Sequence, residues 1–179
     1  MSADATTIWS ELSAVELEHR LDSLLALHGA SLARLAGSYV REAGDRDDLL
    51  QEIAVAIWQA LPRFRGECSE RTFLFRIAHN RAIAFISRRH LPLRETDDDF
   101  DVEDGRPNPE EALATGQQGR RLLDAIQRLP VSLRQVVTLA LEGLSYAEIG
   151  DVLGISETNV GARLTRARQR LRQLLLATP

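Results

Sequence analysis

Apolar residues recur every three or four positions along most of this chain, which is the spacing of one face of an α-helix. Two such stripes run over residues 17–28 and 32–40, and the second is expected to end near Gly44. A third stripe occupies residues 49–61 and ends at Pro62. No stretch keeps the strict alternation of apolar and polar positions that marks a half-buried strand. The pattern therefore predicts an all-α fold.

Polar residues that can cap a helix stand where the third and fourth helices should begin. Asp45 is the expected N-cap of the third helix. Asp47 and Asp48 follow in its first turn, where the helix dipole favours negative charge. Ser69 is the expected N-cap of a fourth helix, which should run to about Arg89. These signals place four helices in the first half of the chain.

An acidic segment interrupts the helical pattern. Residues 95–104 contain 7 acids in 10 positions, and glycine and proline follow at Gly105, Pro107 and Pro109. Like charges repel and prolines break helices, so this segment is expected to be an extended linker. The chain is then divided into an N-terminal arm or first helix, a first domain, the acidic linker and a second domain, at residues 1–24, 25–92, 93–117 and 118–179.

The second domain contains two short helical patterns separated by a tight corner. Ser145 and Glu148 have the spacing of a capping box, in which each residue bonds the other's backbone N–H. Gly154 stands where a left-handed residue would end the first helix, and Ser156 can cap the second. Gly150 is expected where the two helices cross closely and a bulky side chain would push them apart. The pattern is typical of a helix-turn-helix.

Charge alternates along the chain, whose net charge is −4. Five successive segments carry −6, +6, −7, −1 and +4, for residues 1–59, 60–94, 95–124, 125–156 and 157–179. The two basic segments indicate an anionic partner such as nucleic acid. A protein with only two basic segments should make fewer phosphate contacts than a wholly basic protein. Binding by the protein alone should therefore be weak and salt-sensitive, and help from a second protein is expected.

Several classes of protein are disfavoured. Cys68 is the single cysteine, which excludes an internal disulfide and a cysteine-cluster metal site. The 4 histidines have no ligand spacing with carboxylates, and there is no phosphate-cradling glycine loop, so we expect neither an enzyme nor a cofactor or metal. The chain has no apolar run that could span a bilayer and no signal-peptide pattern, so a cytoplasmic protein without membrane insertion is expected.

Taken together, the motifs resemble the extracytoplasmic-function sigma factors, the small two-domain initiation subunits of bacterial RNA polymerase. Those of the first domain are 45–52 with Trp58, 63–67, and 73–80 with Arg88 and Arg89. Those of the second domain are Leu129-Pro130, 142–149 and 163–168. Each motif alone is weak, whereas the full set in this order is specific. The resemblance covers roughly residues 25–91 and 118–176.

The resemblance implies that the third helix is a docking surface for core RNA polymerase. The residues that match this surface are Asp47, Asp48, Leu49, Gln51 and Glu52. Taken alone, the carboxylates have a simpler interpretation, because an acidic first turn suits the helix dipole in any protein. The resemblance also implies an anti-sigma factor that holds the protein inactive.

The loop after the third helix, with the helix that follows it, resembles the family's reader of the minus-ten promoter element. That element is read by flipping a base into a pocket, which requires cations for the backbone and planar, apolar or amide groups for the base. The candidate residues are Arg63, Phe64, Arg65, Arg71, Arg76, Asn80 and Arg81. Phe73, Phe75 and Ile77 are expected mainly to pack in the core.

The second helix of the helix-turn-helix resembles the family's reader of the minus-thirty-five element in duplex DNA. Residues expected near base edges or phosphates are Ser156, Glu157, Thr158 and Asn159. Arginines expected on the backbone or on guanine, which fits their bidentate fork, are Arg163, Arg166 and Arg168. Gly161-Ala162 departs from the family, which often has lysine and serine there, so weaker or altered binding is expected.

Two functions other than initiation stay open. An autonomous helix-turn-helix regulator would bind duplex DNA without polymerase, but it would have no use for the docking-like helix and the aromatic and basic loop of the first domain. A sigma mimic that titrates an anti-sigma factor would fit the departure at Gly161 and Ala162, although the retained arginines count against it.

Overall fold

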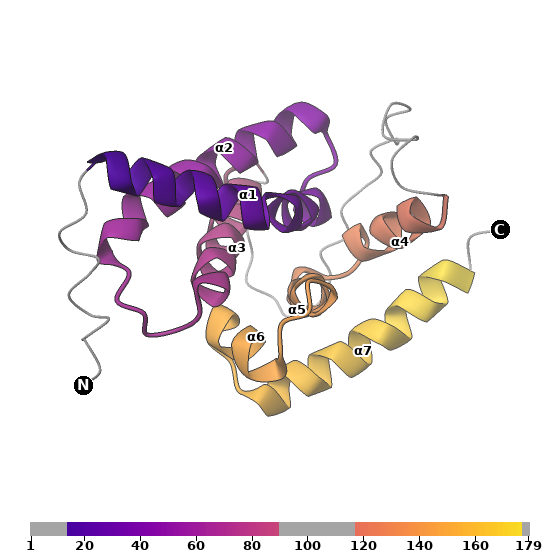
Figure 1. Ribbon diagram of the computed structural model, residues 1–179. Coiled ribbons are helices and arrows are strands. Elements are labelled where there is room, and N and C mark those ends of the chain that lie inside the picture. The colour runs from indigo at the N-terminus through magenta and orange to yellow at the C-terminus, as the bar shows by residue number, and fades with distance from the viewer. Residues whose placement is uncertain (1–13, 90–116, 177–179) are drawn as a thin grey trace.

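The computed structural model describes residues 14–89 and 117–176, and every regular element in these two ranges is a helix (Figure 1). The predicted all-α fold is therefore confirmed for this part of the chain. The helices of the first domain are α1 (Ala14–Tyr39), α2 (Ala43–Ala60), the 3₁₀ turn η1 (Leu61–Arg63) and α3 (Glu70–Arg89). Those of the second are α4 (Gln117–Gln127), α5 (Val131–Leu141), α6 (Tyr146–Leu153) and α7 (Glu157–Leu176).

Some predictions concern residues that the structure does not describe. The acidic segment 95–104 lies outside the described residues, and so do residues 1–13 of the predicted arm. The remainder of that arm forms the first turns of α1.

A single helix, α1, replaces the two helices predicted near the N-terminus. The apolar stripes at 17–28 and 32–40 belong to one continuous element, in which Leu24 and Leu35 are buried. The only helix breaker between the stripes is Gly29, and one glycine costs a helix about 1 kcal/mol, less than the burial of the combined stripe returns. The expected end near Gly44 is also wrong, because α1 ends at Tyr39 and Gly44 lies in α2.

The helix α2 begins earlier than predicted. Glu42 is its N-cap, without a side-chain cap hydrogen bond, and Asp45 lies in the first turn. The expectation that Asp45 caps the helix is therefore wrong. Its carboxylate is paired instead with Arg89 from the end of α3. Ser69 does cap α3 as predicted, because its hydroxyl oxygen accepts the Thr72 N–H at 3.1 Å.

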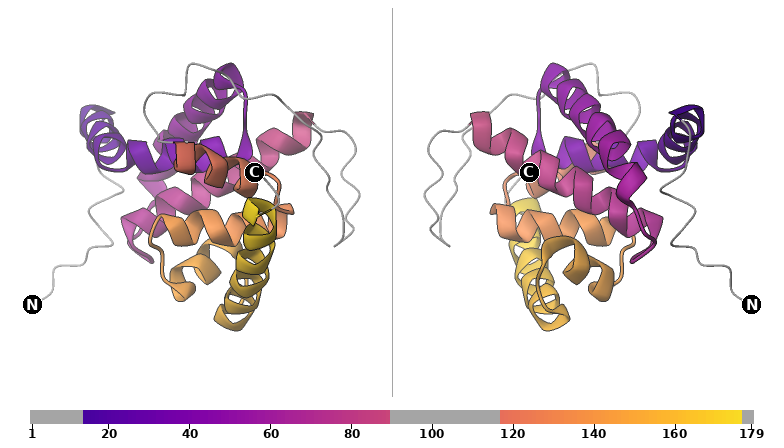
Figure 2. Two further views of the ribbon diagram at one scale, coloured as in Figure 1. Left: turned by 90° about the vertical axis from the view of Figure 1, so that its right-hand side faces the viewer. Right: turned by 90° about the vertical axis from the view of Figure 1, so that its left-hand side faces the viewer.

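The two domains pack against each other in the structure. α1 contacts α4 and α5, while α3 contacts α6. Most of the buried apolar residues of both domains belong to one continuous core cluster. Figure 2 shows α5, α6 and α7 below the first domain from two opposite sides. The sequence left the relative position of the domains open, and the structure places them in direct contact.

Candidate functional site

The first helix of the helix-turn-helix begins with the predicted capping box. The Ser145 hydroxyl accepts the Glu148 N–H at 3.2 Å, and the Glu148 carboxylate accepts the Ser145 N–H at 2.8 Å. These hydrogen bonds lower the pKa of the Glu148 carboxyl, with smaller contributions from Arg71 and Thr72 of α3. At the other end, Gly154 has a φ of 68°, which is the left-handed cap that the sequence indicates.

The turn between α6 and α7 requires glycine at position 150. A Cβ placed on Gly150 would lie 2.7 Å from the Ile155 carbonyl oxygen and 3.9 Å from the Glu157 nitrogen. Both are backbone atoms, so they cannot move away as a flexible side chain could. The predicted close approach is confirmed, although the partner is the backbone of the turn and the start of α7 rather than a side chain of α7.

The helix α7 has a buried side and a polar side. Val160, Leu164 and Ala167 are buried. The Ser156 hydroxyl accepts the Asn159 N–H at 3.3 Å, so Ser156 caps the helix as predicted. The candidate DNA-contacting residues on the polar side are exposed, except for half-buried Asn159 and Arg163: they are Ser156, Glu157, Thr158, Asn159, Arg163, Arg166 and Arg168. This surface matches what a major-groove reader needs.

Two details of the polar side of α7 were not apparent from the sequence. The Arg163 Nε donates to the Asn159 Oδ1 at 3.0 Å, which orients that guanidinium while leaving its two terminal nitrogens for other acceptors. Gly161 faces the ring of Tyr146, because a Cβ at that position would lie 3.6 Å from Tyr146 Cε2. Because residue 161 has no side chain, the Tyr146 ring lies close to the backbone of the candidate DNA-reading helix.

The candidate minus-ten residues occupy different environments. Arg63, Arg65 and Asn80 are exposed, and Arg81 is half-buried. Phe64 is only 6% exposed. Its ring centroid lies 4.4 Å from that of Phe73, so in this arrangement Phe64 packs inside the domain and does not face solvent.

Two further arginines of this set are half-buried on α3. Arg76 carries a buried Nε. Arg71 lies over the ring of Phe75, with its guanidinium carbon 5.8 Å from the ring centroid. Its Nη2 atom is 3.5 Å from where a Cβ of Gly143 would be. Arg71 is therefore turned toward the second domain.

The candidate polymerase-binding residues on α2 are not all at the surface. Asp47, Asp48 and Gln51 are exposed and Glu52 is half-buried. Leu49 has 0% exposure and belongs to the core. The expectation that Leu49 touches a partner is contradicted, because it lies on the apolar stripe that anchors α2 to the first domain.

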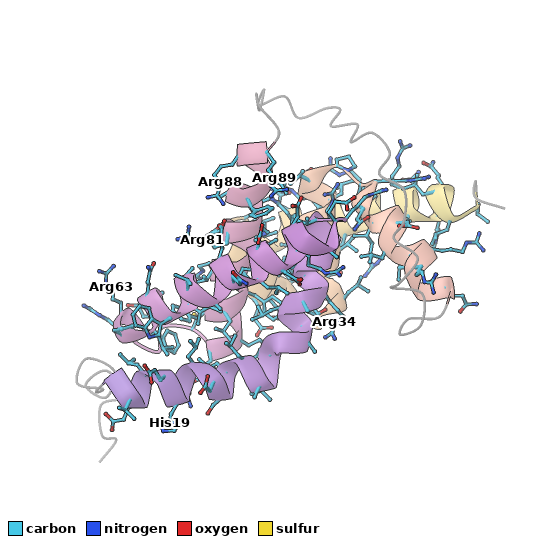
Figure 3. All side chains as sticks on the ribbon, turned by 90° about the horizontal axis from the view of Figure 1, so that it is seen from above. His19, Arg34, Arg63, Arg81, Arg88 and Arg89 are labelled. Atoms are coloured by element: carbon cyan, nitrogen blue, oxygen red, sulfur yellow. The ribbon has the colours of Figure 1, made fainter. Side chains whose placement is uncertain are left out.

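Arginines from the end of α3 lie beside this acidic face. Arg88 donates to both Glu52 oxygens at 2.7 Å, and Arg89 lies 3.9 Å from Asp48. Figure 3 shows Arg88 and Arg89 close together, with Arg63 apart from them and Arg81 between. Between α2 and α3 runs an open groove of about 760 Å³.

No site role was assigned from the sequence to two apolar residues of α2, although Trp58 belongs to a motif that carries the resemblance. Val55 is 53% exposed and Trp58 is 47% exposed. They are three positions apart and lie off the stripe that contains Ile53 and Ile57, so the spacing alone could have identified them as an exposed apolar pair. An exposed tryptophan beside carboxylates is typical of a protein-binding surface.

A buried polar cluster lies where α1, α3 and α5 meet. The His79 Nδ1 is 3.1 Å from the Tyr39 hydroxyl, which agrees with a packing role for His79. Burial lowers the pKa of His79 to about 4 and raises the pKa of Tyr39. Arg134 is 5% exposed and donates to the backbone carbonyls of Gln127 and Leu129. These hydrogen bonds satisfy carbonyls at and just after the end of α4.

Within residues 14–89 and 117–176, no group of histidine, cysteine, aspartate and glutamate residues could hold a metal ion. No helix in those ranges is both long enough and apolar enough to cross a membrane.

Comparisons with known proteins agree over most of the chain. The family model for Sigma-70 region 2 matches residues 24–91, and that for Sigma-70 region 4 matches residues 119–171. The chain is 32% identical to the RNA polymerase sigma factor CnrH of Cupriavidus metallidurans, over 96% of this chain and 95% of that one. It is 31% identical to the ECF RNA polymerase sigma-E factor of Escherichia coli, over 82% of this chain and 81% of that one.

One solved structure has a similar fold at lower sequence identity. It is the sigma factor RpoE of Bartonella quintana, solved in complex with the anti-sigma factor NepR. The TM-score is 0.71 at 22% identity, and the match covers 90% of this chain and 99% of that one.

Proposed function

The chain belongs to the extracytoplasmic-function sigma factors of RNA polymerase, and from that premise we propose how its surfaces divide the work of promoter-specific initiation. The protein binds core RNA polymerase and promoter DNA and directs initiation at a particular set of promoters. The observation that carries this conclusion is the match to sigma factors along 96% of the chain. The protein acts in the cytoplasm and contributes binding rather than catalysis.

The exposed side of α2 is the proposed polymerase-binding surface. Asp47, Asp48 and Gln51 supply exposed polar groups, and Glu52 lies beside them. Trp58 and its neighbour Val55 add exposed apolar area, which gives such a surface its affinity, while the carboxylates give it specificity and speed of encounter. Leu49 holds α2 in the core beneath this surface and makes no contact with polymerase.

The proposed minus-ten reader is the loop after η1 together with the adjacent side of α3. Arg63 and Arg65 are exposed in the loop and suit the DNA backbone, while Asn80 offers an amide to a base. Phe64 supports the loop from inside through its contact with Phe73. Arg71 reaches DNA only when it is free of the second domain. Arg76 and Arg81 lie on the same helix, α3.

The proposed minus-thirty-five reader is the polar side of α7. Asn159 and Arg163 form an oriented pair near the start of the helix, with the arginine fork available for guanine. Arg166 and Arg168 are exposed farther along and suit phosphates. Ser156, Glu157 and Thr158 stand at the N-terminal end that enters the groove.

An apolar groove at the domain boundary is the proposed site for an anti-sigma factor. The groove has a volume of about 620 Å³, and its lining includes apolar Leu122, Ile126 and Leu141 and charged Arg34, Arg46 and Glu142. Leu141 is 59% exposed. Such a groove suits an amphipathic helix that carries acidic residues beside its apolar face. The similar fold of RpoE from B. quintana, solved with an anti-sigma factor, supports this choice of partner.

The decisive experiment is transcription by purified core polymerase on fragmented DNA of the source genome, with mapping of the start sites. We expect reproducible starts that require the protein and share an upstream element. The absence of both core binding and transcription starts would favour the sigma mimic. Duplex binding without polymerase would favour the autonomous regulator.

A double variant and a control variant test the proposed polymerase-binding surface. Trp58→Ala with Asp48→Asn should weaken core binding at least tenfold, because it removes the aromatic group and one exposed carboxylate. Asp22→Asn is the control, because Asp22 is an exposed carboxylate on α1 and is not assigned to this surface. Equal core binding by the test and control variants would disprove the assignment of this surface.

A further inference from the structure

The outer side of α7 lies opposite the residues that anchor this helix in its domain. The buried residues are Val160, Leu164 and Ala167. A residue two positions away from a buried one lies about half a turn away on a helix, and so faces outward. Thr158, Ala162 and Thr165 occupy such positions in the first half of α7, and all three are exposed. They are four and three positions apart, so they share one face.

This outer face is open to a partner. Figure 1 shows α7 at the edge of the molecule, with α4, α5 and α6 all on one side of it. Those three helices are also the ones that contact α7. The outer face lies in the first half of the second helix of the motif, and that half is the part that enters the major groove in a helix-turn-helix. The chemistry of Thr158, Ala162 and Thr165 therefore decides what the helix can read at its centre.

The hydroxyl group of Thr165 is turned back onto its own helix. It donates to the Gly161 carbonyl oxygen at 3.0 Å, four positions earlier. A hydroxyl group has one proton, so Thr165 has no donor left for a base edge, and its methyl group and an acceptor lone pair remain. Ala162 offers a methyl group alone. Side by side, Ala162 and Thr165 thus present methyl groups to the groove and no hydrogen-bond donor.

The donors of this helix stand beside the methyl groups. The guanidinium of Arg163 is oriented by Asn159, whose Oδ1 accepts from Nε at 3.0 Å, and its fork fits guanine. Arg166 is exposed one position after Thr165 and suits a phosphate. Neither arginine can replace a donor at the position of Ala162, because each leaves the helix in a different direction. Base edges that face Ala162 and Thr165 must therefore be distinguished without a donated hydrogen bond.

Thymine is the base that such a surface can recognise. It is the one base that carries a methyl group in the major groove, and alanine and the threonine methyl group are its usual apolar partners. Apolar contact needs heavy atoms within about 4.5 Å, so the helix has to lie deep in the groove. The short side chains of Ala162 and Thr165 permit that approach, because no longer group separates the helix backbone from the base edges.

We propose that Ala162 and Thr165 are specificity-determining residues, which select thymine through its C5 methyl group while Arg163 reads guanine. The proposal rests on the proposed function, because it assigns a chemistry to the minus-thirty-five reader. Each methyl contact should strengthen binding about fourfold, the value for removing one methylene-sized group from water. The upstream element should therefore contain thymine near a guanine, on either strand.

Promoters that contain deoxyuridine test this readout with the holoenzyme formed from the full-length protein and core polymerase. One promoter is taken from the mapped starts, and each thymine of its upstream element is replaced in turn by deoxyuridine. The replacement removes the C5 methyl group and keeps the hydrogen-bonding groups of the base. The apparent dissociation constant should rise about fourfold at the thymines read by Ala162 and Thr165. The same replacement between the two promoter elements is the control and should change nothing.

Two variants separate the methyl group of Thr165 from its hydroxyl group. Thr165→Ser keeps the hydroxyl group that bonds the Gly161 carbonyl and removes the methyl group, so one thymine should become insensitive to deoxyuridine. Thr165→Val keeps a methyl group and removes the hydroxyl group, so the sensitivity at that thymine should remain. Loss of sensitivity in Thr165→Val but not in Thr165→Ser would show that the hydroxyl group reads the base and would overturn the assignment of Thr165.

Ala162→Gly tests the second methyl group in the same way. It should make the neighbouring thymine insensitive to deoxyuridine, while Thr165→Ser retains sensitivity there. Full sensitivity at every thymine in both Ala162→Gly and Thr165→Ser would overturn the proposal, because the methyl groups of the protein would then have no part in the readout.

The remaining outcomes separate this proposal from the proposed function. An upstream element without thymine, or equal binding of all deoxyuridine promoters by an active holoenzyme, would overturn the methyl readout and leave the proposed function intact. A protein that neither binds core polymerase nor supports any start would overturn the proposed function, and the assignment of Ala162 and Thr165 with it. The two failures are distinguishable because only the first occurs with an active holoenzyme.

Discussion

The helix-turn-helix and the domain boundary differ in where their stabilising contacts come from. In the former, Ser145 bonds Glu148 and Ser156 bonds Asn159, each across three positions of the chain. At the boundary, Arg34 and Glu142 are 108 positions apart. Local contacts form whenever the segment folds, whereas boundary contacts form only when two separately folded parts dock. The helix-turn-helix is therefore fixed by its own segment, whereas the packing of the two domains depends on long-range contacts.

The largest expected effect tests the rigidity of the motif. Gly150→Val should lower the free energy of unfolding by about 3 kcal/mol, because the added Cβ meets the backbone oxygen of Ile155 in a turn that cannot yield. Urea titration followed by circular dichroism measures the loss. Gly44→Val is the control, since a Cβ at Gly44 has nothing within 4 Å. Equal losses of unfolding free energy in both variants would mean that the backbone of the turn can shift to accommodate the added side chain.

The next effect tests the asymmetry of the boundary. Arg34→Ala should lower the free energy of unfolding by about 2 kcal/mol, because it leaves a shielded carboxylate without its partner. The loss is smaller than for a fully buried pair because Arg34 itself is exposed. Glu142→Gln should cost less, because Arg34 can return to water. Urea titration of both variants gives the two costs. A larger loss for Glu142→Gln would contradict this asymmetry.

A pH effect of about 1 kcal/mol should come from the buried cluster at the boundary. The folded-state pKa of His79, about 4, lies below its ordinary 6.5, so the unfolded chain binds the extra proton. The stabilisation is fully present above pH 6.5 and is lost as the pH falls toward 4. Unfolding free energies at about pH 7.5 and 5.5 measure the difference.

His79→Phe is the comparison for that experiment, because it keeps the bulk of the ring and removes the titration. His28, whose pKa burial also lowers, is present in both proteins and contributes equally. An unchanged pH dependence in His79→Phe would show that another group is responsible.

The smallest effect is a gain. Gly161→Ala should raise the free energy of unfolding by up to about 1 kcal/mol, because alanine suits a helix interior better than glycine. The added Cβ meets the Tyr146 ring at 3.6 Å, an ordinary contact. The midpoint of urea unfolding measures the gain. A loss of stability would indicate that the ring cannot tolerate even a methyl group.

Most local structure was predictable because its causes are local. The capping box at Ser145 and Glu148, the left-handed Gly154 and the cap of α3 by Ser69 all follow from residues a few positions apart. The predictions failed where a distant element intervened. Asp45 pairs with Arg89 of α3 instead of capping α2. The sequence also did not indicate that Phe64 packs onto Phe73 in the structure.

The sequence by itself determined the helical periodicity, the helix-turn-helix and the charge segregation, because each depends on side-chain chemistry within a turn or two of chain. It also indicated the sigma-factor family through the order of its motifs. Only the tertiary structure decided that Phe64 packs onto Phe73, that Asp45 pairs with Arg89, and that Arg34 pairs with Glu142. Those outcomes depend on which surfaces meet across the fold, and spacing along the chain does not encode that.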